Sequence, residues 1–561
     1  MPVPSALVQA GLVGLESRTD NTFAHRRAAE APTAPGPAPC LDAVLMLWPA
    51  RSSTMASMPR ALEPGFVGRT YDDFLFRPQR GIVSSRQDVS LRTRLSRRLE
   101  MQLPVISANM DSVTEARMAR TMALEGGLGF IHRAMPVEEQ AELVRRVKRT
   151  HGFLVDQPMA LPRGTTIGEA VRVTRAHNVS GLLIEESPGS GILAGLLSHR
   201  DVPPRGAGRE QPVDRFMTPF DRLVTAPPGI SMEDAEALMF AQRVEKLPLV
   251  DEHRRIQGLI TMRDILLARR RPYSTRDLRG RLMVGGAIGA RGDYLERAGE
   301  LIRAGVDLIL IDVAHAHAEM IREAVEAFRA RYGEAELAVG NVGTGEGARY
   351  LVDLGVDAVK VGIGPGRGCR TRLETAAGVP QLQAIREVWC AIGEEVPIIA
   401  DGGVKDDKDL FLALVCGASS VMLGSLLSGT DEAPGHVIED PATREKRKIY
   451  RGMTSPQAVF EALYDDGSNL DSDGGASMRD EDAGGGALES ALAVPAEGQE
   501  TQVPYHGSVV DILHRIRGHL RSSISYGGGS SLREVRDRVV VDPLNYLIPL
   551  SEASRRESYE R

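Results

Sequence analysis

Eight short apolar segments constrain the fold of this chain most strongly, because each is followed by a polar or glycine-rich loop and then by a helical pattern. Near-continuous apolar strands that alternate with helices are typical of a parallel sheet buried on both faces. Eight such units predict an α/β fold, a closed (β/α)8 TIM barrel rather than an open sheet. The segments are PVISANMD (104–111), LGFIHR (128–133), VGGAIGA (284–290), DLILIDVAH (307–315), ELAVGNVGT (336–344), DAVKVGIGPG (357–366), VPIIADGG (396–403) and SSVMLGSLLSG (419–429).

The length of 561 residues predicts more than one domain. Residues 1–65 are rich in Ala, Pro and Arg, and we expect a disordered N-terminal extension there. The barrel is assigned to 66–152 and 273–561, with a separate insert at 153–272 between its second and third strands. An acidic, glycine-rich stretch at 465–486 predicts a flexible loop within the barrel part.

The insert carries an internal repeat, since GLLSHRD (195–201) recurs as GLITMRD (258–264). The stretch RGTTIGEA before the first copy matches PGISMEDA before the second. Each copy is expected to form a helix, a pair of strands and a further helix. The pair resembles tandem cystathionine-β-synthase-like (CBS) domains, and this resemblance implies a regulatory nucleotide such as ATP or GTP. A structural spacer without a ligand is the alternative.

Composition excludes some functions. The formal net charge of −7 provides no general attraction to nucleic acid. The four cysteines form no CxxC pair, which argues against a zinc site and suits a reducing, cytoplasmic setting. The apolar stretch at 41–50 is too short to span a membrane and lies too far along the chain for a typical signal peptide. Cys390 and Cys416 have apolar neighbours and are expected to be inert core thiols.

A short pattern recurs before three of the predicted strands: RAGVDLILID, DLGVDAVKVG and VCGASSVMLG. Each copy places a glycine, Gly305, Gly355 or Gly417, just after a predicted helix. Glycine adopts the left-handed backbone at a helix end with little strain, so we assign the repeat a structural role.

Polar and glycine residues gather at the predicted carboxyl ends of the strands. In TIM barrels the chemistry lies at this rim, where strands run into the following loops. The residues that the strand assignment brings together are Asn109, Asp111, Asp312, Asn341, the loop 362–371, Asp401 to Gly403, and Gly424 with Ser425.

The stretch VGIGPGRGCRTR (361–372) places Cys369 among glycines and arginines. A dinucleotide fingerprint fits poorly, because the GxGxxG register is absent. An inert turn is the second interpretation. The third is a nucleophile loop, in which glycines let the backbone approach a flat ligand, neighbouring arginines lower the thiol pKa, and the Thr371 hydroxyl bonds to a reacting group.

The same stretch, with IADGGV, MLGSLLSGTDEAPG, YRGMTS and VPAEGQETQVPYHG, resembles the IMP dehydrogenase and GMP reductase family from Tyr71 onward. The resemblance implies NAD-dependent oxidation of IMP to XMP in guanine nucleotide biosynthesis. It assigns to Cys369 the thiolate that adds to carbon 2 of the purine and forms a covalent thioimidate. It also implies potassium as a second cofactor and a homotetramer or octamer.

The resemblance also implies the site residues. The catalytic residues are Cys369, Thr371 and Glu497. Substrate is bound by Asp401, Gly402, Gly403, Gly424, Ser425, Tyr450, Gly452, Met453, Arg367 and Asn341. NAD is bound by Asp312, Gly362, Ile363 and Gly364, and potassium by carbonyls of Gly364, Gly366 and Cys369. His315 and His317 alternate along a strand end, but with no evident third ligand we do not predict a metal there.

The sequence departs from the family pattern at three points. Arg367 stands where the dehydrogenases usually carry a phosphate-binding serine, and no Arg-Tyr pair occurs between Tyr450 and Glu497, where they carry the water-activating arginine. Thr371 with Glu497 is then the remaining proton path. SANMD (107–111) looks more like the reductase branch, whereas EGQE (497–500) and GTDEAPG (429–435) look like the dehydrogenase branch. Dehydrogenase is the favoured prediction. An NADPH-dependent GMP reductase and a catalytically silent nucleotide sensor are the alternatives.

Overall fold

The structure is a computed structural model that describes residues 60–149, 154–155, 158–176, 179, 181–203, 208–269, 271–452 and 498–559. Most of the N-terminal extension and all of the acidic stretch 465–486 lie outside these ranges.

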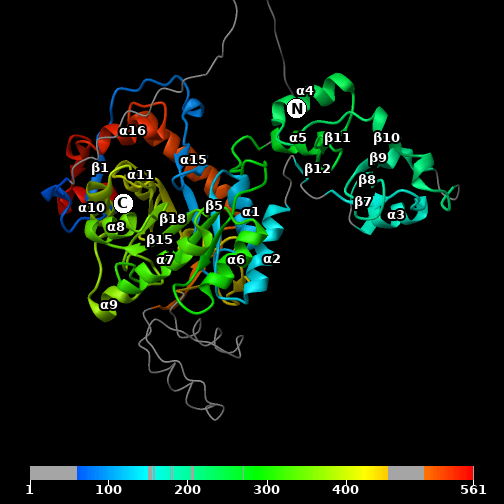
Figure 1. Ribbon diagram of the computed structural model, residues 1–561. Helices are drawn as coiled ribbons and strands as arrows, with labels where there is room; N and C mark the ends of the chain where they lie inside the picture. Colours follow the sequence, from blue (N-terminus) through cyan, green and yellow to red (C-terminus); the bar gives the residue numbers. More distant parts are fainter. Residues whose placement is uncertain are drawn as a thin grey trace, which may run out of the picture. The chain divides into compact units, whose positions relative to one another are not determined.

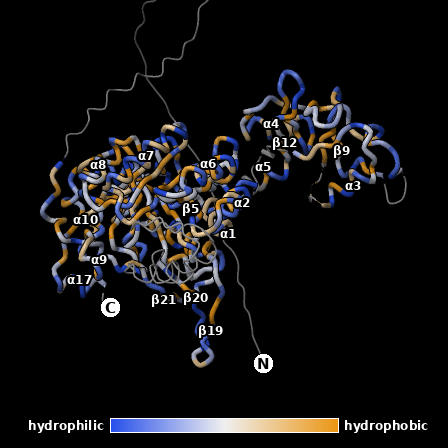
Figure 2. The backbone as a smooth tube through the Cα atoms, turned by 60° about the horizontal axis from the view of Figure 1, so that its bottom comes forward, coloured by the Kyte–Doolittle hydropathy of each residue, from blue (hydrophilic) through white to orange (hydrophobic). Residues whose placement is uncertain are grey.

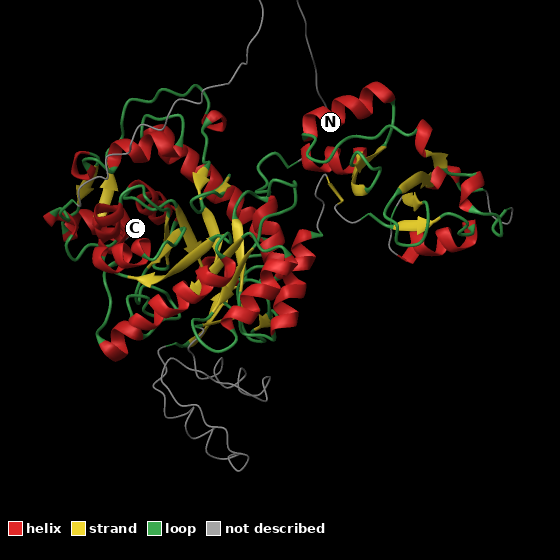
Figure 3. Cartoon of the chain, in the orientation of Figure 1, coloured by secondary structure: helices red, strands yellow, loops and turns green. Residues whose placement is uncertain are grey.

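Eight parallel strands close into a barrel (Figures 1 and 3). The order around the barrel is β13–β14–β15–β16–β17–β18–β4–β5. Each predicted apolar segment supplies one strand, which confirms the predicted fold class. The strands are β4 (Val105–Ser107), β5 (Leu128–Ile131), β13 (Gly285–Ile288), β14 (Leu308–Asp312), β15 (Leu337–Val342), β16 (Ala358–Val361), β17 (Ile398–Asp401) and β18 (Ser420–Leu423).

Helices surround the barrel and cover the outer face of its strands (Figure 1). Their apolar residues are buried on one side, as expected for helices that pack on a sheet. They are α1 (Ala116–Leu124), α2 (Val137–Lys148), α6 (Tyr294–Ala304), α7 (Glu319–Tyr332), α8 (Gly345–Asp353), α10 (Gln381–Ile392) and α11 (Asp407–Val415), joined by α15 (Val509–Tyr526) and α16 (Leu532–Val539).

Side chains alternate between two apolar layers, and the strands are among the most hydrophobic parts of the chain (Figure 2). Phe130, Leu310 and Ile399 belong to the cluster inside the barrel, whereas Ile311 and Ile398 belong to the layer beneath the helices. This period of two determines which residues at a strand end point into the barrel mouth.

The recurrent glycine pattern is structural, as predicted. Gly305, Gly355 and Gly417 have φ of +93°, +80° and +132°. The aspartate that follows in two copies has a role that the sequence did not reveal. Asp307 accepts the amide of Val284 at 2.8 Å, and Asp357 accepts the amide of Leu337 at 2.9 Å. Each carboxylate therefore caps the start of the preceding barrel strand.

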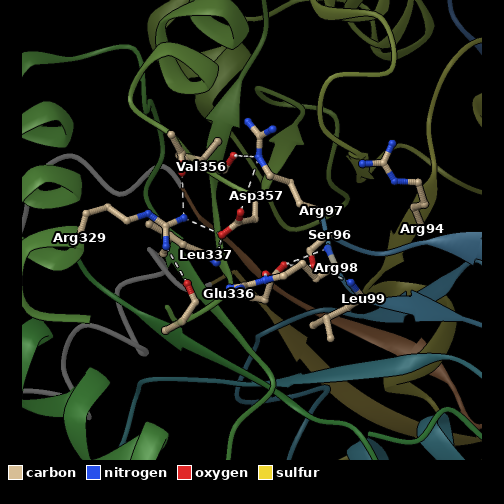
Figure 4. Close-up of polar contacts among 12 residues, drawn as sticks. Arg94, Ser96, Arg97, Arg98, Leu99, Arg329, Glu336, Leu337, Val356 and Asp357 are labelled. Atoms are coloured by element: carbon tan, nitrogen blue, oxygen red, sulfur yellow. Dashed lines mark hydrogen bonds and ion pairs between the residues drawn. The ribbon is translucent and has the colours of Figure 1, made fainter. Parts of the chain in front are cut away.

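A hairpin lies at the amino-terminal end of the barrel, and Figure 4 shows the polar contacts of its turn. It consists of β2 (Thr93–Arg94) and β3 (Glu100–Met101), and its turn contains Ser96 and Arg98. Both side chains bind Glu336, which is 7% exposed and directly precedes β15. Arg97 bonds to the carbonyl of Val356 at 3.1 Å. The turn therefore ties two neighbouring strand starts together.

We expect Glu336→Gln to lower the free energy of unfolding by about 2 kcal/mol, because a buried charge-assisted contact is lost. Glu334 is the matched control, since it pairs with the same Arg98 but is 97% exposed. Glu334→Gln should change the free energy of unfolding by less than about 0.5 kcal/mol. Urea unfolding of both variants tests this, and equal losses would contradict the role of Glu336.

The insert folds into two small sheets, each with its own apolar cluster. The first contains β7 (Ala160–Pro162), β8 (Gly181–Glu185), β9 (Leu193–Ser198) and β10 (Thr218–Pro219), and the second contains β6 (Leu154–Val155), β11 (Lys246–Val250) and β12 (Ile256–Thr261). Helices α3 (Ile167–Ala176) and α4 (Met232–Gln242) precede the paired strands.

The final helix of the two copies differs from our expectation. The second copy continues into α5 (Met262–Arg269), whereas the described residues of the first copy form a short 3-10 helix at this point, His199–Asp201. The sequence DVPPRG follows at this point, and its prolines cannot continue a helix.

A three-stranded antiparallel sheet of β19 (Ile438–Glu439), β20 (Lys446–Arg451) and β21 (Glu500–Pro504) lies at one end of the barrel (Figure 2). β1 (Phe74–Phe76) pairs with β22 (Leu547–Pro549), and α17 (Glu552–Tyr559) follows. Within the described ranges, every helix is too short or too polar to span a lipid bilayer.

Candidate functional site

The carboxyl ends of the parallel strands bring the predicted site residues to one rim. Asp312 ends β14, Asn341 lies near the end of β15, and Asp401 ends β17. Gly424 follows β18 and precedes the short helix α12 (Ser425–Ser428). These four residues therefore lie at the carboxyl ends of barrel strands, where the sequence predicted them.

Cys369 lies in the loop that joins β16 to α9 (Thr371–Thr375). Its side chain is partly exposed, and its Sγ lies 3.2 Å from the Thr371 hydroxyl. Cys390 and Cys416 are buried, and burial raises the pKa of the Cys390 thiol to about 11 and that of Cys416 to about 12. Cys369 is therefore the accessible thiol of the described residues.

The loop is held in place by contacts to its backbone. Arg372 donates to the carbonyl of Ile363 from Nε at 3.2 Å and from Nη2 at 3.1 Å. Gln499 donates from Nε2 to the carbonyl of Arg367 at 3.0 Å, and its amide donates to the carbonyl of Gly368 at 3.0 Å. The chain on the far side of 453–497 thus returns directly against the cysteine loop.

The same loop packs against the end of β17. A Cβ added to Gly402 would lie 3.2 Å from the Gly366 nitrogen, and one added to Gly362 would lie 2.2 Å from the Asp401 carbonyl oxygen. Gly362 also has a φ of +149°. Both this backbone conformation and the close contact with Asp401 exclude a side chain at this position. The backbone of the loop is consequently bare where it faces the rim.

Tyr450 connects the loop to the end of β18. It is 4% exposed, and its hydroxyl would lie 2.8 Å from a Cβ added to Gly424. Burial and the nearby Asp401 raise the pKa of Tyr450 above its ordinary value, so the phenol stays protonated and able to donate. Gly452 is equally close-packed, since an added Cβ would lie 2.6 Å from the Gly368 carbonyl oxygen.

A buried lysine that sequence analysis missed joins the two rim aspartates. The Nζ of Lys360 lies 2.7 Å from Asp312 Oδ1 and 2.6 Å from Asp401 Oδ2, and the side chain is only 2% exposed. Lys360 lies two residues after Ala358 on β16, so it shares the face of Ala358 and points into the barrel. Its cross-strand partner is Gly340, where a Cβ would lie 2.5 Å from the Cβ of Lys360.

Two amides complete this network. Asn109 Nδ2 donates to Asp312 Oδ2 at 2.6 Å, and Asn341 Nδ2 donates to Asp401 Oδ2 at 3.0 Å. Although burial opposes ionisation of Asp312, the charge of Lys360 and the Asn109 bond lower its pKa below the ordinary value. Burial likewise disfavours the charged amine, but the two carboxylates raise the pKa of Lys360. Asp312 therefore carries its charge in an ion pair with Lys360.

Two acceptors at the rim remain available to a ligand. Asp401 receives both of its side-chain contacts on Oδ2, and no described residue donates to Oδ1. The Oδ1 of Asn341 is buried without a hydrogen-bond partner in the described chain. Buried polar atoms are nearly always satisfied, so a bound molecule is expected to donate here.

His132 is a second rim residue that sequence analysis missed. It follows β5 and is 3% exposed. Its Nδ1 accepts the amide of Ala134 at 3.2 Å, which places the ring proton on Nε2. That nitrogen has no partner among the residues described. Burial and the charges of Arg451 and Arg297 lower the pKa of His132 to about 4.

We expect His132 to make the stability of the protein fall as the pH decreases from about 6.5 to about 4. The unfolded chain binds a proton near pH 6.5, whereas the folded imidazole resists protonation until pH 4. The loss amounts to about 3 kcal/mol over this window. His132→Gln should remove this part of the pH dependence, as measured by urea unfolding at pH 5.0 and 7.5. If the free energy of unfolding changed equally between pH 5.0 and 7.5 in His132→Gln and in the unaltered chain, His132 would not be the source of this pH dependence.

Two of the predicted site residues, Met453 and Glu497, lie outside the described residues. His315 and His317 have ring centroids 6.3 Å apart, and the described residues contain no group of three or more His, Cys, Asp or Glu side chains that would hold a metal ion.

Comparisons with known proteins place this geometry in context. The family model for the IMP dehydrogenase / GMP reductase domain matches residues 68–560. Inosine-5'-monophosphate dehydrogenase of Aquifex aeolicus is 39% identical over 475 residues, covering 84% of this chain and 92% of the relative. The enzyme of the same name from Nitrosopumilus maritimus is 40% identical over 473 residues, covering 84% and 94%.

Solved structures of the reductase branch are also similar. A variant of GMP reductase from Trypanosoma brucei in complex with guanosine 5'-monophosphate is 34% identical, with a TM-score of 0.71 and coverage of 88% of this chain and 97% of that chain. GMP reductase from the same organism in complex with guanosine 5'-triphosphate is 32% identical, with a TM-score of 0.63 and coverage of 84% and 96%.

Proposed function

The chain belongs to the IMP dehydrogenase / GMP reductase family, and we propose that it is an NAD-dependent oxidoreductase that converts IMP to XMP in guanine nucleotide synthesis. The placement of Cys369 is the observation that carries this proposal. Its thiol is partly exposed, lies 3.2 Å from a hydroxyl, and belongs to a loop packed on the end of β17. The two relatives at 39% and 40% identity favour oxidation over reduction.

The first chemical step uses the sulfur of Cys369. The thiolate bonds to carbon 2 of the purine, and this addition makes carbon 2 a good hydride donor. NAD, when bound, accepts the hydride. Gly362 lies in the same loop as Cys369, and its backbone packs directly against Asp401, so we assign this backbone to the nicotinamide ring of NAD. Oxidation leaves the nucleotide attached to Cys369 as a thioimidate.

The second step releases the product. Water adds to carbon 2, the carbon–sulfur bond breaks, and the thiolate re-forms as XMP leaves. We assign the proton of this water to the Thr371 hydroxyl, a role that its 3.2 Å distance from the Cys369 Sγ supports. Glu497 is proposed as the acceptor that relays the proton onward.

The substrate contacts follow from the rim. We assign the ribose hydroxyl groups to Asp401 Oδ1 and Asn341 Oδ1, because both oxygens can accept a hydrogen bond from a ligand. The backbone amides near Gly424 and the short helix after it suit the 5'-phosphate. Arg367 is exposed and its charge reaches Tyr450, so we assign it to the phosphate as well. The remaining substrate contacts are assigned to Gly402, Gly403, Ser425, Tyr450, Gly452 and Met453.

Both cofactors fit the residues present. Asp312 and the backbone of Gly362, Ile363 and Gly364 would hold NAD, because Asp312 ends β14 at the rim and the three loop residues follow β16 at the same rim. Potassium would be held by carbonyl oxygens of Gly364, Gly366 and Cys369. The Gly366 carbonyl accepts the Cys369 amide at 3.1 Å and keeps a second lone pair for a hard cation.

NADH formation from IMP and NAD, followed by absorbance, tests the proposal. GMP reductase is the second candidate, favoured by SANMD and by the solved relatives. It predicts consumption of NADPH with GMP and release of ammonia, and this result in place of NADH formation would overturn the assignment. A silent nucleotide sensor predicts neither activity.

The insert at 153–272 is proposed to be a tandem CBS pair that binds ATP or GTP, because the two repeats fold with matching strand pairs. We further propose that the chain assembles as a homotetramer or octamer and acts in the cytoplasm. Activity titrations with ATP and GTP test the regulatory part. Flat responses to both nucleotides would reject it.

A further inference from the structure

A cavity lies at the amino-terminal end of the barrel, opposite the rim, where the chain returns from the insert. Its volume is about 530 Å³. Three segments form it: the end of α1, the linker after the insert and the middle of α15, of which α1 and α15 pack side by side (Figure 1). We name it the junction cavity, and it is lined by Leu124, Glu125, Arg271, Pro272, Tyr273, His514 and Arg517.

The basic groups of the junction cavity converge on one carboxylate. Glu125 Oε1 lies 3.1 Å from Arg271 Nη1. Its Oε2 lies 3.0 Å from His514 Nε2 and 3.3 Å from Arg517 Nη2. A single negative charge therefore faces two guanidinium groups and an imidazole.

A third arginine, Arg521, adds to the excess of positive charge around Glu125. Arg517 and Arg521 stack on Tyr273, with their guanidinium carbons 5.1 and 5.3 Å from the ring centroid. The Nε of Arg521 is buried without a hydrogen-bond partner in the described part of the chain. Asp277, the acidic residue of the same linker, does not offset the charge, because Lys148 and Arg281 already engage it.

The arginines retain donors for a ligand. Arg271 contacts Glu125 through Nη1 alone, and Arg517 uses only Nη2, toward the carbonyl and the carboxylate of Glu125. Stacking on Tyr273 holds the Arg517 guanidinium in a defined plane. Fixed guanidinium forks match the oxygens of a phosphate group.

We propose that the junction cavity binds a small phosphate-bearing anion. The excess positive charge selects an anion, and the number of unused guanidinium donors selects one with several oxygens. The site is distinct from the phosphate contacts proposed at Gly424, because it lies at the opposite end of the barrel. Arg271 belongs to the linker from the insert, so an anion here contacts both the linker and the barrel.

Calorimetric titration of the full chain with inorganic pyrophosphate, in the presence of saturating IMP, tests the proposal. One binding event should weaken about tenfold or more in Arg271→Gln and in Arg517→Gln, since each variant removes a charge-assisted contact. Arg271 is 46% exposed, so its replacement should leave folding intact. NADH formation from IMP reports separately on the proposed enzymatic function.

Arg80→Gln is the matched control. Arg80 lines a cavity of about 600 Å³ that also contains a second arginine, Arg538, but no carboxylate. The pyrophosphate titration of the Arg80→Gln variant should superimpose on that of the unaltered chain. The proposal is overturned if Arg271→Gln and Arg517→Gln bind as the unaltered chain does. It is equally overturned if Arg80→Gln weakens binding to the same extent, because the attraction would then be general.

Discussion

Cys369→Ala should lower kcat for NADH formation from IMP by about 10³-fold or more, because no other group replaces the sulfur that bonds to carbon 2. Stability should change by less than about 1 kcal/mol, since the side chain is partly exposed and the substitution removes one atom. Mass spectrometry of the unaltered chain with IMP and NAD should reveal one nucleotide attached to Cys369.

Cys390→Ala provides the control for this experiment. Cys390 is 5% exposed in α10, and burial raises its pKa to about 11, so it is neither accessible nor ionised at neutral pH. This variant should lose about 1 kcal/mol of stability and keep its kcat. A Cys369→Ala protein with a rate within tenfold of the unaltered chain would remove the covalent mechanism and leave only the fold.

The barrel was predictable because strand burial leaves a continuous apolar signal in the sequence. PVISANMD and VPIIADGG show the strand and the polar loop that follows it within eight residues each. The rule that chemistry lies at strand ends then predicted that Asp401 and Cys369 lie at one rim, and the structure has both residues at the ends of barrel strands. Such local signals suffice when the fold repeats one unit eight times.

Lys360 and His132 escaped prediction for a different reason. Each occurs in a segment interpreted as an apolar strand. Only the pairing of Lys360 with Gly340 shows that this lysine points into the barrel, and only the end of β5 at Ile131 shows that His132 lies at the rim. The hairpin at the barrel floor was missed because its contacts join distant parts of the chain, such as Ser96 and Glu336. Long-range pairing of this kind has no local pattern that a single sequence displays.

Lys360→Met should reduce both stability and catalysis. It leaves Asp312 and Asp401 without their shared cation in a largely buried setting, at a cost of about 3 kcal/mol in the free energy of unfolding. We expect kcat/KM to fall about 100-fold, because the two carboxylates lose the geometry proposed for binding IMP and NAD. The pKa of Asp312 should rise when the positive charge is removed, so the acidic limb of the kcat/KM profile should move to higher pH.

Lys148→Met separates this positioning role from a merely structural one. Lys148 is 5% exposed and also bridges two carboxylates, Asp277 at 3.1 Å and Asp307 at 2.6 Å, at the opposite end of the barrel. Its loss should cost similar stability but leave kcat/KM within about threefold and the pH profile unmoved. If both variants lost kcat/KM equally, or if the acidic limb of Lys360→Met stayed in place, Lys360 would stabilise the barrel without organising the site. The comparison is informative because the two lysines differ in the end of the barrel they occupy and not in the kind of ion pair they form.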